Sequence, residues 1–175
     1  MTSRELDFIM QQLRRTPDVV RALLEGLPDD VCRTNYGAET FSAFDVVGHL
    51  IWGDLDDWVP RARHILEHGD AVPFVPFDRY VMYKRDHGKS MQELLDEFGV
   101  VRARVIAELA SLQLDDAALQ SRGMHPDLGG VTMRQLLETW AVHDLHHVAQ
   151  ICKALARQRS DAVGVWRAYL GILGA

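Results

Sequence analysis

Apolar residues recur at helical spacing along most of this chain, and this periodicity constrains the fold more than any other feature. Between Thr132 and about Arg157, for example, apolar positions repeat every three or four residues. The strict apolar and polar alternation that marks a half-buried strand is almost absent. Amphipathic helices bury their apolar stripes by packing against one another. The sequence therefore predicts an all-α fold.

Local signals place the ends of four long helices. The first is expected to begin at Thr16-Pro17, after a short helical segment around 4–14, and to end at Gly26 to Pro28. Capping boxes, in which Ser or Thr is followed three residues later by an acidic or amide side chain, open the other three helices. These boxes begin at Ser42, Ser90 and Thr132, and their helices are expected to reach about His68, Leu112 and Arg157.

The connections between these helices also carry clear signals. Residues 29–41 and the Pro-rich stretch 70–77 have the composition of loops, whereas 78–86 and 161–173 are expected to form short helices. Pro60 should kink the second long helix after Trp58. We therefore expect a four-helix bundle with short additional helices, folded as a single domain over residues 1–175.

Composition and charge exclude several classes of protein. With 47% apolar residues, 25% charged residues and no apolar run near the roughly 20 residues that cross a bilayer, the chain has a globular composition. The net charge of −6 and the scattered basic residues argue against a nucleic-acid partner. Two cysteines, Cys32 and Cys152, are too few for a disulfide framework, and the N-terminus lacks the apolar core of a secretory signal. We expect a cytoplasmic protein with no membrane partner.

Two histidines in the last long helix indicate a metal site. His143 and His147 are four residues apart, so their side chains share one helix face and can bind one ion. They fall next to Trp140 at the edge of the apolar stripe, which directs them into the bundle or along its seam. Without a metal, two buried imidazoles would each need another hydrogen-bond partner. His146 lies on the polar flank of the same helix and is better explained as a surface residue.

A catalytic metal ion usually has three protein ligands and an open position, so a third donor is needed. His49 is the best candidate, because apolar residues surround it on nearly every side of its helix. Its side chain projects away from the main apolar stripe of the helix, however, so the sequence leaves open whether His49 is a ligand or a structural residue. The remaining histidines are His64, His68 and His87, which have surface contexts, and His125, which is a spare candidate.

Two histidine motifs occur together in this chain. Val47-Gly-His49-Leu50 lies early in the second long helix, and Trp140-Ala-Val-His-Asp-Leu-His-His-Val-Ala-Gln-Ile151 lies in the fourth. With Thr16-Pro17, Trp58-Val-Pro-Arg61 and Gly88-Lys-Ser90, they resemble the DinB-like superfamily of metal-binding four-helix bundles, over nearly the whole chain. The resemblance implies that one histidine from the second helix and the spaced pair from the fourth hold a divalent ion, usually zinc or nickel. Those positions are His49, His143 and His147.

The resemblance also implies possible activities. Members of the superfamily include S-transferases that use bacillithiol or mycothiol and a mycothiol-dependent maleylpyruvate isomerase, and members commonly form homodimers. An ion held by three neutral imidazoles favours an anionic fourth ligand, so it activates a thiol, or lowers the pKa of a water towards about 7. We therefore expect a metal-dependent enzyme of the thiol S-transferase type that acts on a small electrophile, with a low-molecular-weight thiol as co-substrate.

Two alternatives to the S-transferase remain open from the sequence. His143-Asp144-x-x-His147 differs by one methylene from the His-Glu-x-x-His motif of metallohydrolases, so Asp144 would assist a metal-bound water in a hydrolase. Asp144 is also suited to orienting an imidazole or to a helix–helix contact. The other alternative is a non-catalytic, dimeric, metal-binding stress protein, for which the apolar residues 46–52 would suit a dimer interface or the internal core. Trp52 and Trp140 are expected to belong to the core or to line the site.

Overall fold

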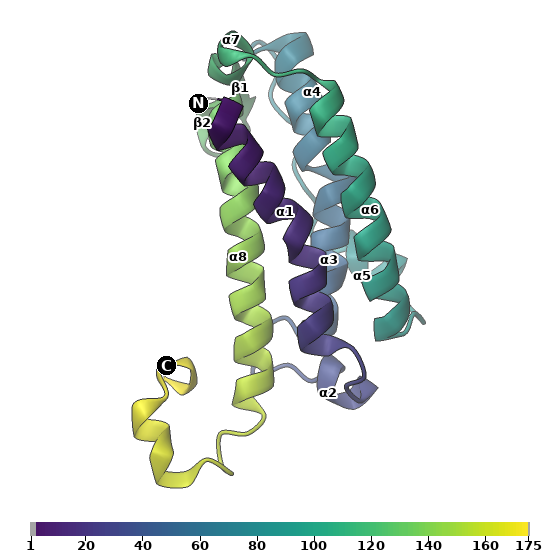
Figure 1. Ribbon diagram of the computed structural model, residues 1–175, viewed down its shortest axis with the longest axis vertical. Coiled ribbons are helices and arrows are strands. Elements are labelled where there is room, and N and C mark those ends of the chain that lie inside the picture. Colours follow the sequence, from purple (N-terminus) through teal and green to yellow (C-terminus); the bar gives the residue numbers. More distant parts are fainter. Residues whose placement is uncertain (1–2, 175) are drawn as a thin grey trace.

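Four long helical columns form the body of the molecule in the computed structural model, which describes residues 3–174 (Figure 1). The columns are α1 (Ser3–Leu24), α3 (Ala43–Asp56) continued by α4 (Trp58–His68), α6 (Met91–Ser111) and α8 (Met133–Arg157). Short helices α2 (Asp29–Arg33), α5 (Val81–Arg85) and α7 (Asp116–Gln120) lie in the connections. The predicted all-α four-helix bundle with short additional helices is confirmed. The predicted domain also includes residues 1, 2 and 175, which lie outside the described part of the chain.

The columns do not simply alternate in direction along the bundle. Helices α1 and α8 lie side by side and run the same way, whereas α3–α4 and α6 run the opposite way (Figure 1). The amide of Gln12 donates to the Ala141 carbonyl, and Arg134 pairs with Glu5, which fixes the parallel register of α1 against α8. Helix α3 packs against both α6 and α8. Residues of α3 and α8 therefore meet inside the bundle.

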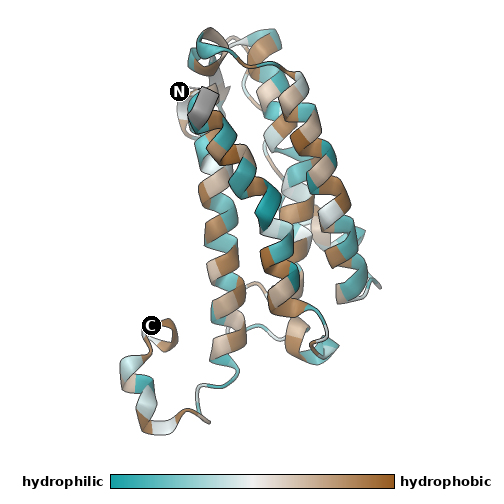
Figure 2. Cartoon of the chain, in the orientation of Figure 1, coloured by the Kyte–Doolittle hydropathy of each residue, from teal (hydrophilic) through white to brown (hydrophobic). Residues whose placement is uncertain are grey.

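Apolar side chains fill the centre of the bundle along its length, and the hydropathy colouring shows brown and teal faces alternating around each column (Figure 2). The core includes Leu13 of α1, Leu50 of α3, Phe98 of α6 and Trp140 of α8, all almost fully buried. The apolar residues Val46, Val47, Leu50 and Ile51 are buried in this core as well. Of the two roles considered for residues 46–52, these side chains therefore serve the internal core.

Helix α1 is continuous through Pro17, which corrects the prediction of a short segment followed by a new helix at Thr16-Pro17. Proline lacks the N–H that would bond the carbonyl four residues earlier, here that of Leu13. Arg102 of α6 donates a hydrogen bond to this carbonyl, with an Nη1–O distance of 3.0 Å. A partner from another helix thus replaces the missing backbone donor, which local sequence signals do not reveal.

The predicted helix from Ser42 to His68 is divided at Asp57, whose φ of −112° and ψ of −68° break the regular helix. The break falls one residue before the kink expected after Trp58. Pro60 is the third residue of α4, a position where the backbone N–H has no partner within the helix. The three predicted capping boxes, at Ser42, Ser90 and Thr132, are all confirmed with both reciprocal hydrogen bonds.

Three segments differ from the sequence prediction. The expected loop 29–41 contains the short helix α2. An antiparallel hairpin of β1 (Arg122–His125) and β2 (Gly129–Thr132) precedes α8, although its four-residue strands are too short to show a clear alternation. The expected terminal helix is replaced by two 3₁₀ turns, η1 (Gly164–Tyr169) and η2 (Gly171–Leu173), which project from the end of α8 (Figure 1).

Crossing a bilayer requires a helix of roughly 20 predominantly apolar residues. None of the helices in residues 3–174 is both long and apolar enough to span a bilayer.

Candidate metal centre

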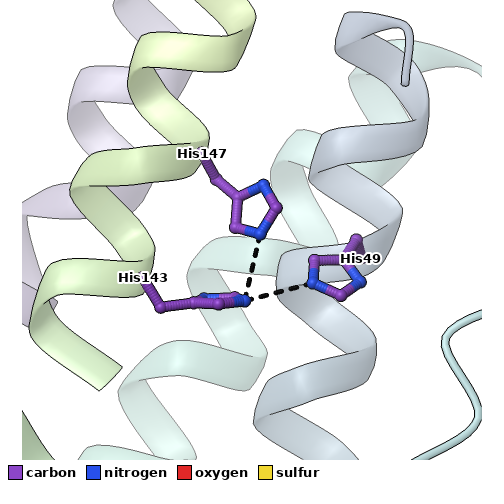
Figure 3. A group of neighbouring side chains, drawn as sticks. All are labelled: His49, His143 and His147. Atoms are coloured by element: carbon purple, nitrogen blue, oxygen red, sulfur yellow. Dashed lines mark hydrogen bonds between the residues drawn. The ribbon is translucent and has the colours of Figure 1, made fainter. Parts of the chain in front are cut away.

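Three histidines converge inside the bundle, as Figure 3 shows: His49 from α3, and His143 and His147 from α8. The Nε2 atom of His143 lies 3.1 Å from Nε2 of His49 and 3.0 Å from Nε2 of His147. All three candidate ligand atoms lie within 4.8 Å of one another. Helical periodicity alone left the direction of His49 open, and the structure directs its ring at the pair on α8.

The two helices bring these rings together for simple reasons. The four-residue spacing stacks His143 and His147 on one face of α8, one turn apart. His49 lies in the second turn of α3 between the buried residues Gly48 and Leu50, and only 8% of its own surface is exposed. The packing of α3 against α8 closes the arrangement.

Burial keeps all three imidazoles neutral. Loss of water around the ring is the main cause in each case, and it lowers the pKa of His49 to about 3, of His143 to about 2 and of His147 to about 4. The neighbouring imidazoles lower the pKa of His49 and His143 further. A neutral imidazole has a free lone pair, which is the form that binds a metal. The site is therefore ready for a cation near neutral pH.

The donor set fits a divalent transition metal. A tetrahedral zinc ion with Zn–N bonds of 2.0–2.1 Å separates its nitrogen ligands by about 3.3 Å, close to the separations of the His143 nitrogen from the other two. Two further nitrogens, Nδ1 of His49 and of His143, are buried without a hydrogen-bond partner among the described residues. Without an ion, a single proton on Nε2 of His143 would have to serve both neighbouring Nε2 atoms, which leaves the cluster short of hydrogen-bond donors in a largely apolar interior. The geometry and the burial thus both match a metal site.

Gln150, which the sequence reasoning did not single out, orients one of the ligands. Its Oε1 lies 2.7 Å from Nδ1 of His147, so this ring nitrogen donates the hydrogen bond and Nε2 keeps the lone pair. The hydrogen bond also opposes the effect of burial on the pKa of His147. Gln150 is three residues after His147 on α8, and this helical spacing is the signal that could have identified it.

Asp144 lies between the two histidines in sequence but is bound to a different group. Both of its carboxylate oxygens accept hydrogen bonds from Arg102 of α6, and Arg102 also donates to Asp54 of α3 at 2.7 Å. All three side chains are buried. Among the roles considered for Asp144, the structure shows the helix–helix contact. Arg102 was missed in the sequence, although an arginine among the apolar positions of α6 was a visible anomaly.

The buried cluster contains one positive group and two acidic groups, because the guanidinium of Arg102 pairs with both carboxylates. Burial opposes the charge of Arg102, but Asp144 and Asp54 outweigh it and raise the pKa of the guanidinium further. Burial raises the pKa of Asp54 to about 6 despite its bond to Arg102. Asp54 receives one hydrogen bond from Arg102, whereas Asp144 receives two.

Aromatic side chains surround the three histidines. Phe41 and Phe77 contact the ring of His49, with centroid distances of 5.7 and 5.8 Å, and Trp58 contacts the ring of His143 at 5.0 Å. Of the two tryptophans considered in the sequence, Trp140 is fully buried and stacks on Trp58, whereas Trp52 stacks on Phe77. The site thus has apolar walls, which strengthen electrostatic interactions inside it.

The other histidines lie apart from the three-histidine cluster or point away from it. His146 is exposed, and its ring meets only the edge of the His147 ring, at a centroid distance of 5.2 Å. His125 accepts hydrogen bonds from two backbone N–H groups in the turn of the hairpin. The remaining three are His64, which is hydrogen-bonded to the Val72 carbonyl, His68 and His87. Cys152 is a free, half-buried thiol.

A helical bundle with three neutral histidines on two facing helices defines a class of metal-binding helical proteins. Comparison of the sequence with family models places the chain within one family of this class. The model of the DinB superfamily matches residues 12–151, a range that contains all three histidines, and the chain belongs to this superfamily. No curated protein matches the sequence.

A solved structure shows the same fold. YfiT from Bacillus subtilis, described as a probable metal-dependent hydrolase with an unusual four-helix bundle topology, aligns with a TM-score of 0.76. The alignment covers 90% of each chain at 22% sequence identity. The arrangement of the helices is therefore shared between the two proteins.

Proposed function

We propose that this protein is an enzyme that uses zinc or nickel, held by His49, His143 and His147, to transfer a small thiol to a small electrophile. The observation that supports this proposal most strongly is the convergence of three buried, neutral imidazole nitrogens from two helices. When bound there, the ion would supply the Lewis acidity that stabilises a thiolate at neutral pH. The expected cytoplasmic location supplies reduced thiols.

The side chains around the three histidines have roles that are compatible with this proposed function. Gln150 holds the ring of His147 with Nε2 directed at the other two nitrogens. Phe41, Phe77 and Trp58 exclude water and leave an apolar surface for the organic part of a substrate. The described side chains in contact with the three imidazoles are aromatic or amide groups, so the nucleophile is best supplied by a second small molecule. This is the reason for preferring thiol transfer.

Hydrolysis is the second candidate, and the fold shared with YfiT favours it because that protein is described as a probable metal-dependent hydrolase. Asp144 would be the assisting group. Its carboxylate is bound to Arg102, so a role as base requires that this ion pair opens. A third candidate is the non-catalytic, dimeric, metal-binding stress protein, in which the ion only supports the fold.

Metal content tests the shared basis of all three candidates. Purified protein, reconstituted with zinc or nickel, should hold one ion per chain by elemental analysis, and His147→Gln should hold much less than one. His146→Gln is the matched control, since it removes an exposed neighbouring imidazole in the same turn, and it should retain the ion. Equal metal content in both variants would refute the site.

Turnover then separates the candidates. Metal-loaded protein is assayed with a panel of cellular thiols and electrophiles, and with ester and amide substrates without thiol. Thiol-dependent consumption of an electrophile, lost in His147→Gln and retained in Asp144→Asn protein that still holds metal, supports transfer. Thiol-independent hydrolysis that Asp144→Asn abolishes supports the hydrolase. No rate above that of the free metal in either assay, with chelation lowering only the melting temperature, supports the non-catalytic protein.

A further inference from the structure

A short segment before α5 lies against the ring of His49. Phe77 contacts this ring with a centroid distance of 5.8 Å, and it also stacks on Trp52, three residues after His49 on α3. The indole Nε1 of Trp52 donates a hydrogen bond to the Asp78 carbonyl at 3.0 Å. These contacts hold residues 77–80, which we call the 77–80 segment, against α3.

The other end of the 77–80 segment is also connected to His49. The carboxylate of Asp78 accepts a hydrogen bond from the Tyr80 backbone N–H at 2.9 Å, which forms a tight turn with Arg79 at its centre. A series of aromatic ring contacts then leads from the turn back to His49, through Tyr80, Tyr83 and Phe41. Arg79 therefore lies at the edge of the metal centre, between two sets of rings that both reach His49.

Arg79 has no partner of opposite charge in the described part of the chain. Its side chain is exposed, and it forms no hydrogen bond or ion pair with any described residue. Burial and the neighbouring His147 lower the pKa of His49 most, and the charge of Arg79 lowers it further. Arg102, whose charge also acts on the three histidines, is already bound to Asp144. Arg79 is thus free to bind an anion from outside the chain.

The charges at the metal centre favour a ligand with an anionic group. A divalent ion held by three neutral imidazoles keeps its two positive charges, and Arg79 adds a further positive charge beside them. The guanidinium presents a planar fork of N–H groups that matches the two oxygens of a carboxylate, and one carboxylate balances its single charge. A small molecule held at the centre can therefore place a carboxylate against Arg79 while its carbon chain lies along Phe41 and Phe77.

We propose that Arg79 is a specificity residue, which binds a carboxylate on a small molecule held at the metal centre. The proposal rests on the proposed function and names the class of substrate that the site accepts. The carboxylate belongs to the thiol or to the electrophile, and two assays distinguish these sources.

Calorimetric titration of the zinc-loaded full chain tests the thiol as the source. The probes are γ-mercaptobutyrate and its neutral amide, and the wild type should bind the carboxylate more tightly. Arg79→Gln should reduce the ratio of the two affinities about 10-fold, the low end for a hydrogen bond to a charged group, because Arg79 is exposed to water. Arg79→Lys keeps the charge without the fork and should retain part of the ratio. Arg104→Gln, which removes an exposed arginine of α6, is the matched control and should leave the ratio unchanged.

Turnover tests the electrophile as the source. The thiol is neutral β-mercaptoethanol, and the electrophiles are monomethyl fumarate, which carries a carboxylate, and dimethyl fumarate, which does not. The ratio of their kcat/KM values should fall in Arg79→Gln and persist in Arg104→Gln, with equal zinc content in all proteins by elemental analysis. A fall in either assay assigns the carboxylate to the molecule varied in that assay.

Two outcomes separate a failure of this proposal from a failure of the proposed function. Ratios that Arg79→Gln changes in neither assay, although the zinc-loaded wild type binds both thiols, would overturn the role of Arg79 and leave thiol binding at the ion intact. A zinc-loaded wild type that binds neither thiol and turns over neither electrophile would overturn both.

Discussion

Single residues decide whether the three histidines can act as ligands. His147 binds through Nε2 only if its proton stays on Nδ1, and the hydrogen bond to Gln150 holds it there. His49 and His143 have no such partner among the described residues, and their rings are fixed by packing against Phe41, Phe77 and Trp58. At this scale the chain orients one ligand by a hydrogen bond and two by aromatic contacts.

The role of Gln150 is therefore testable by its removal. Gln150→Ala should weaken zinc binding about 10- to 100-fold, the usual effect of losing a residue that orients a metal ligand, with little change in fold. The dissociation constant is measured by competition with a chelating dye. His146→Gln, in the same helical turn, serves as the control and should bind zinc like the wild type. Unchanged affinity in Gln150→Ala would show that packing alone orients His147.

The depressed histidine pKa values predict how the metal-free protein responds to pH. The three folded pKa values lie between about 2 and about 4, below the unfolded value of about 6.5. Below pH 6.5 the unfolded chain binds protons that the folded chain does not, so stability is full above pH 6.5 and falls as the pH drops towards 4. At pH 5.5 the loss is about 1.4 kcal/mol for each histidine.

Urea unfolding in the presence of a chelator, at pH 7 and at pH 5.5, measures this loss. His147→Gln should lose less stability between the two pH values than the wild type does, because one depressed histidine is gone. His87→Gln, which removes an exposed imidazole, should show the wild-type difference. An equal loss of stability between pH 7 and pH 5.5 in the wild type, His147→Gln and His87→Gln would mean that burial does not prevent protonation of the three histidines.

At the scale of helices, a buried ion cluster joins the four columns. Arg102 of α6 binds Asp54 of α3, Asp144 of α8 and the Leu13 carbonyl of α1 that Pro17 leaves without a donor. Since Asp144 is adjacent to His143 in α8, the ion cluster also fixes the position of the histidine pair along the bundle axis relative to α3. Removing the guanidinium would leave two carboxylates buried without a counter-charge.

Arg102→Met should therefore destabilise the fold by about 3–5 kcal/mol, the usual effect of removing one partner of a buried ion pair. Adding Asp54→Asn and Asp144→Asn to that variant should recover part of the loss. Arg63→Met is the control, because Arg63 pairs with Glu108 at the surface, where ion pairs contribute about 0–1 kcal/mol. Urea midpoints compare the variants. Similar losses for Arg102→Met and Arg63→Met would contradict the assigned role of the cluster.

The close approach of α5 to α3 depends on a glycine. A Cβ on Gly48 would lie 2.4 Å from Oδ2 of the buried Asp86, whereas a Cβ on Gly99, in the middle of α6, would meet nothing within 4 Å. Gly48→Ala should cost about 1–3 kcal/mol through this overlap. Gly99→Ala should instead gain about 0.5–1 kcal/mol from helix propensity. Thermal unfolding measures both, and a stabilising Gly48→Ala would show that α5 moves freely.

Sequence patterns predicted those elements whose signals are local. The capping boxes at Ser42, Ser90 and Thr132 lie within four residues, and the histidine pair on α8 lies within one turn, so both were visible. The continuity of α1 through Pro17 was not predicted, because it depends on Arg102, which lies 85 residues after Pro17 in the sequence. The direction of His49 was also a property of packing between α3 and α8, and only the family resemblance suggested it.

At the scale of the whole molecule, the histidines connect the second helical column to the last. The segment between His49 and His143 contains α4, α5, α6, α7 and the hairpin, so an ion held by both would close a long loop of the chain. A ligand that binds only the folded state stabilises it by an amount that grows with its concentration. Metal binding should therefore stabilise the entire bundle and not one helix.

The last prediction concerns this global effect. Zinc at about 100 times its dissociation constant should raise the free energy of unfolding by about 2.7 kcal/mol, seen as a higher melting temperature. His49→Gln should abolish most of this rise even though His143 and His147 remain together on α8, because two ligands on one helix do not connect it to α3. His68→Gln, an exposed histidine on α4, should respond to zinc like the wild type. A full zinc response in His49→Gln would show that α8 binds the metal by itself, and that the ion does not hold the two columns together.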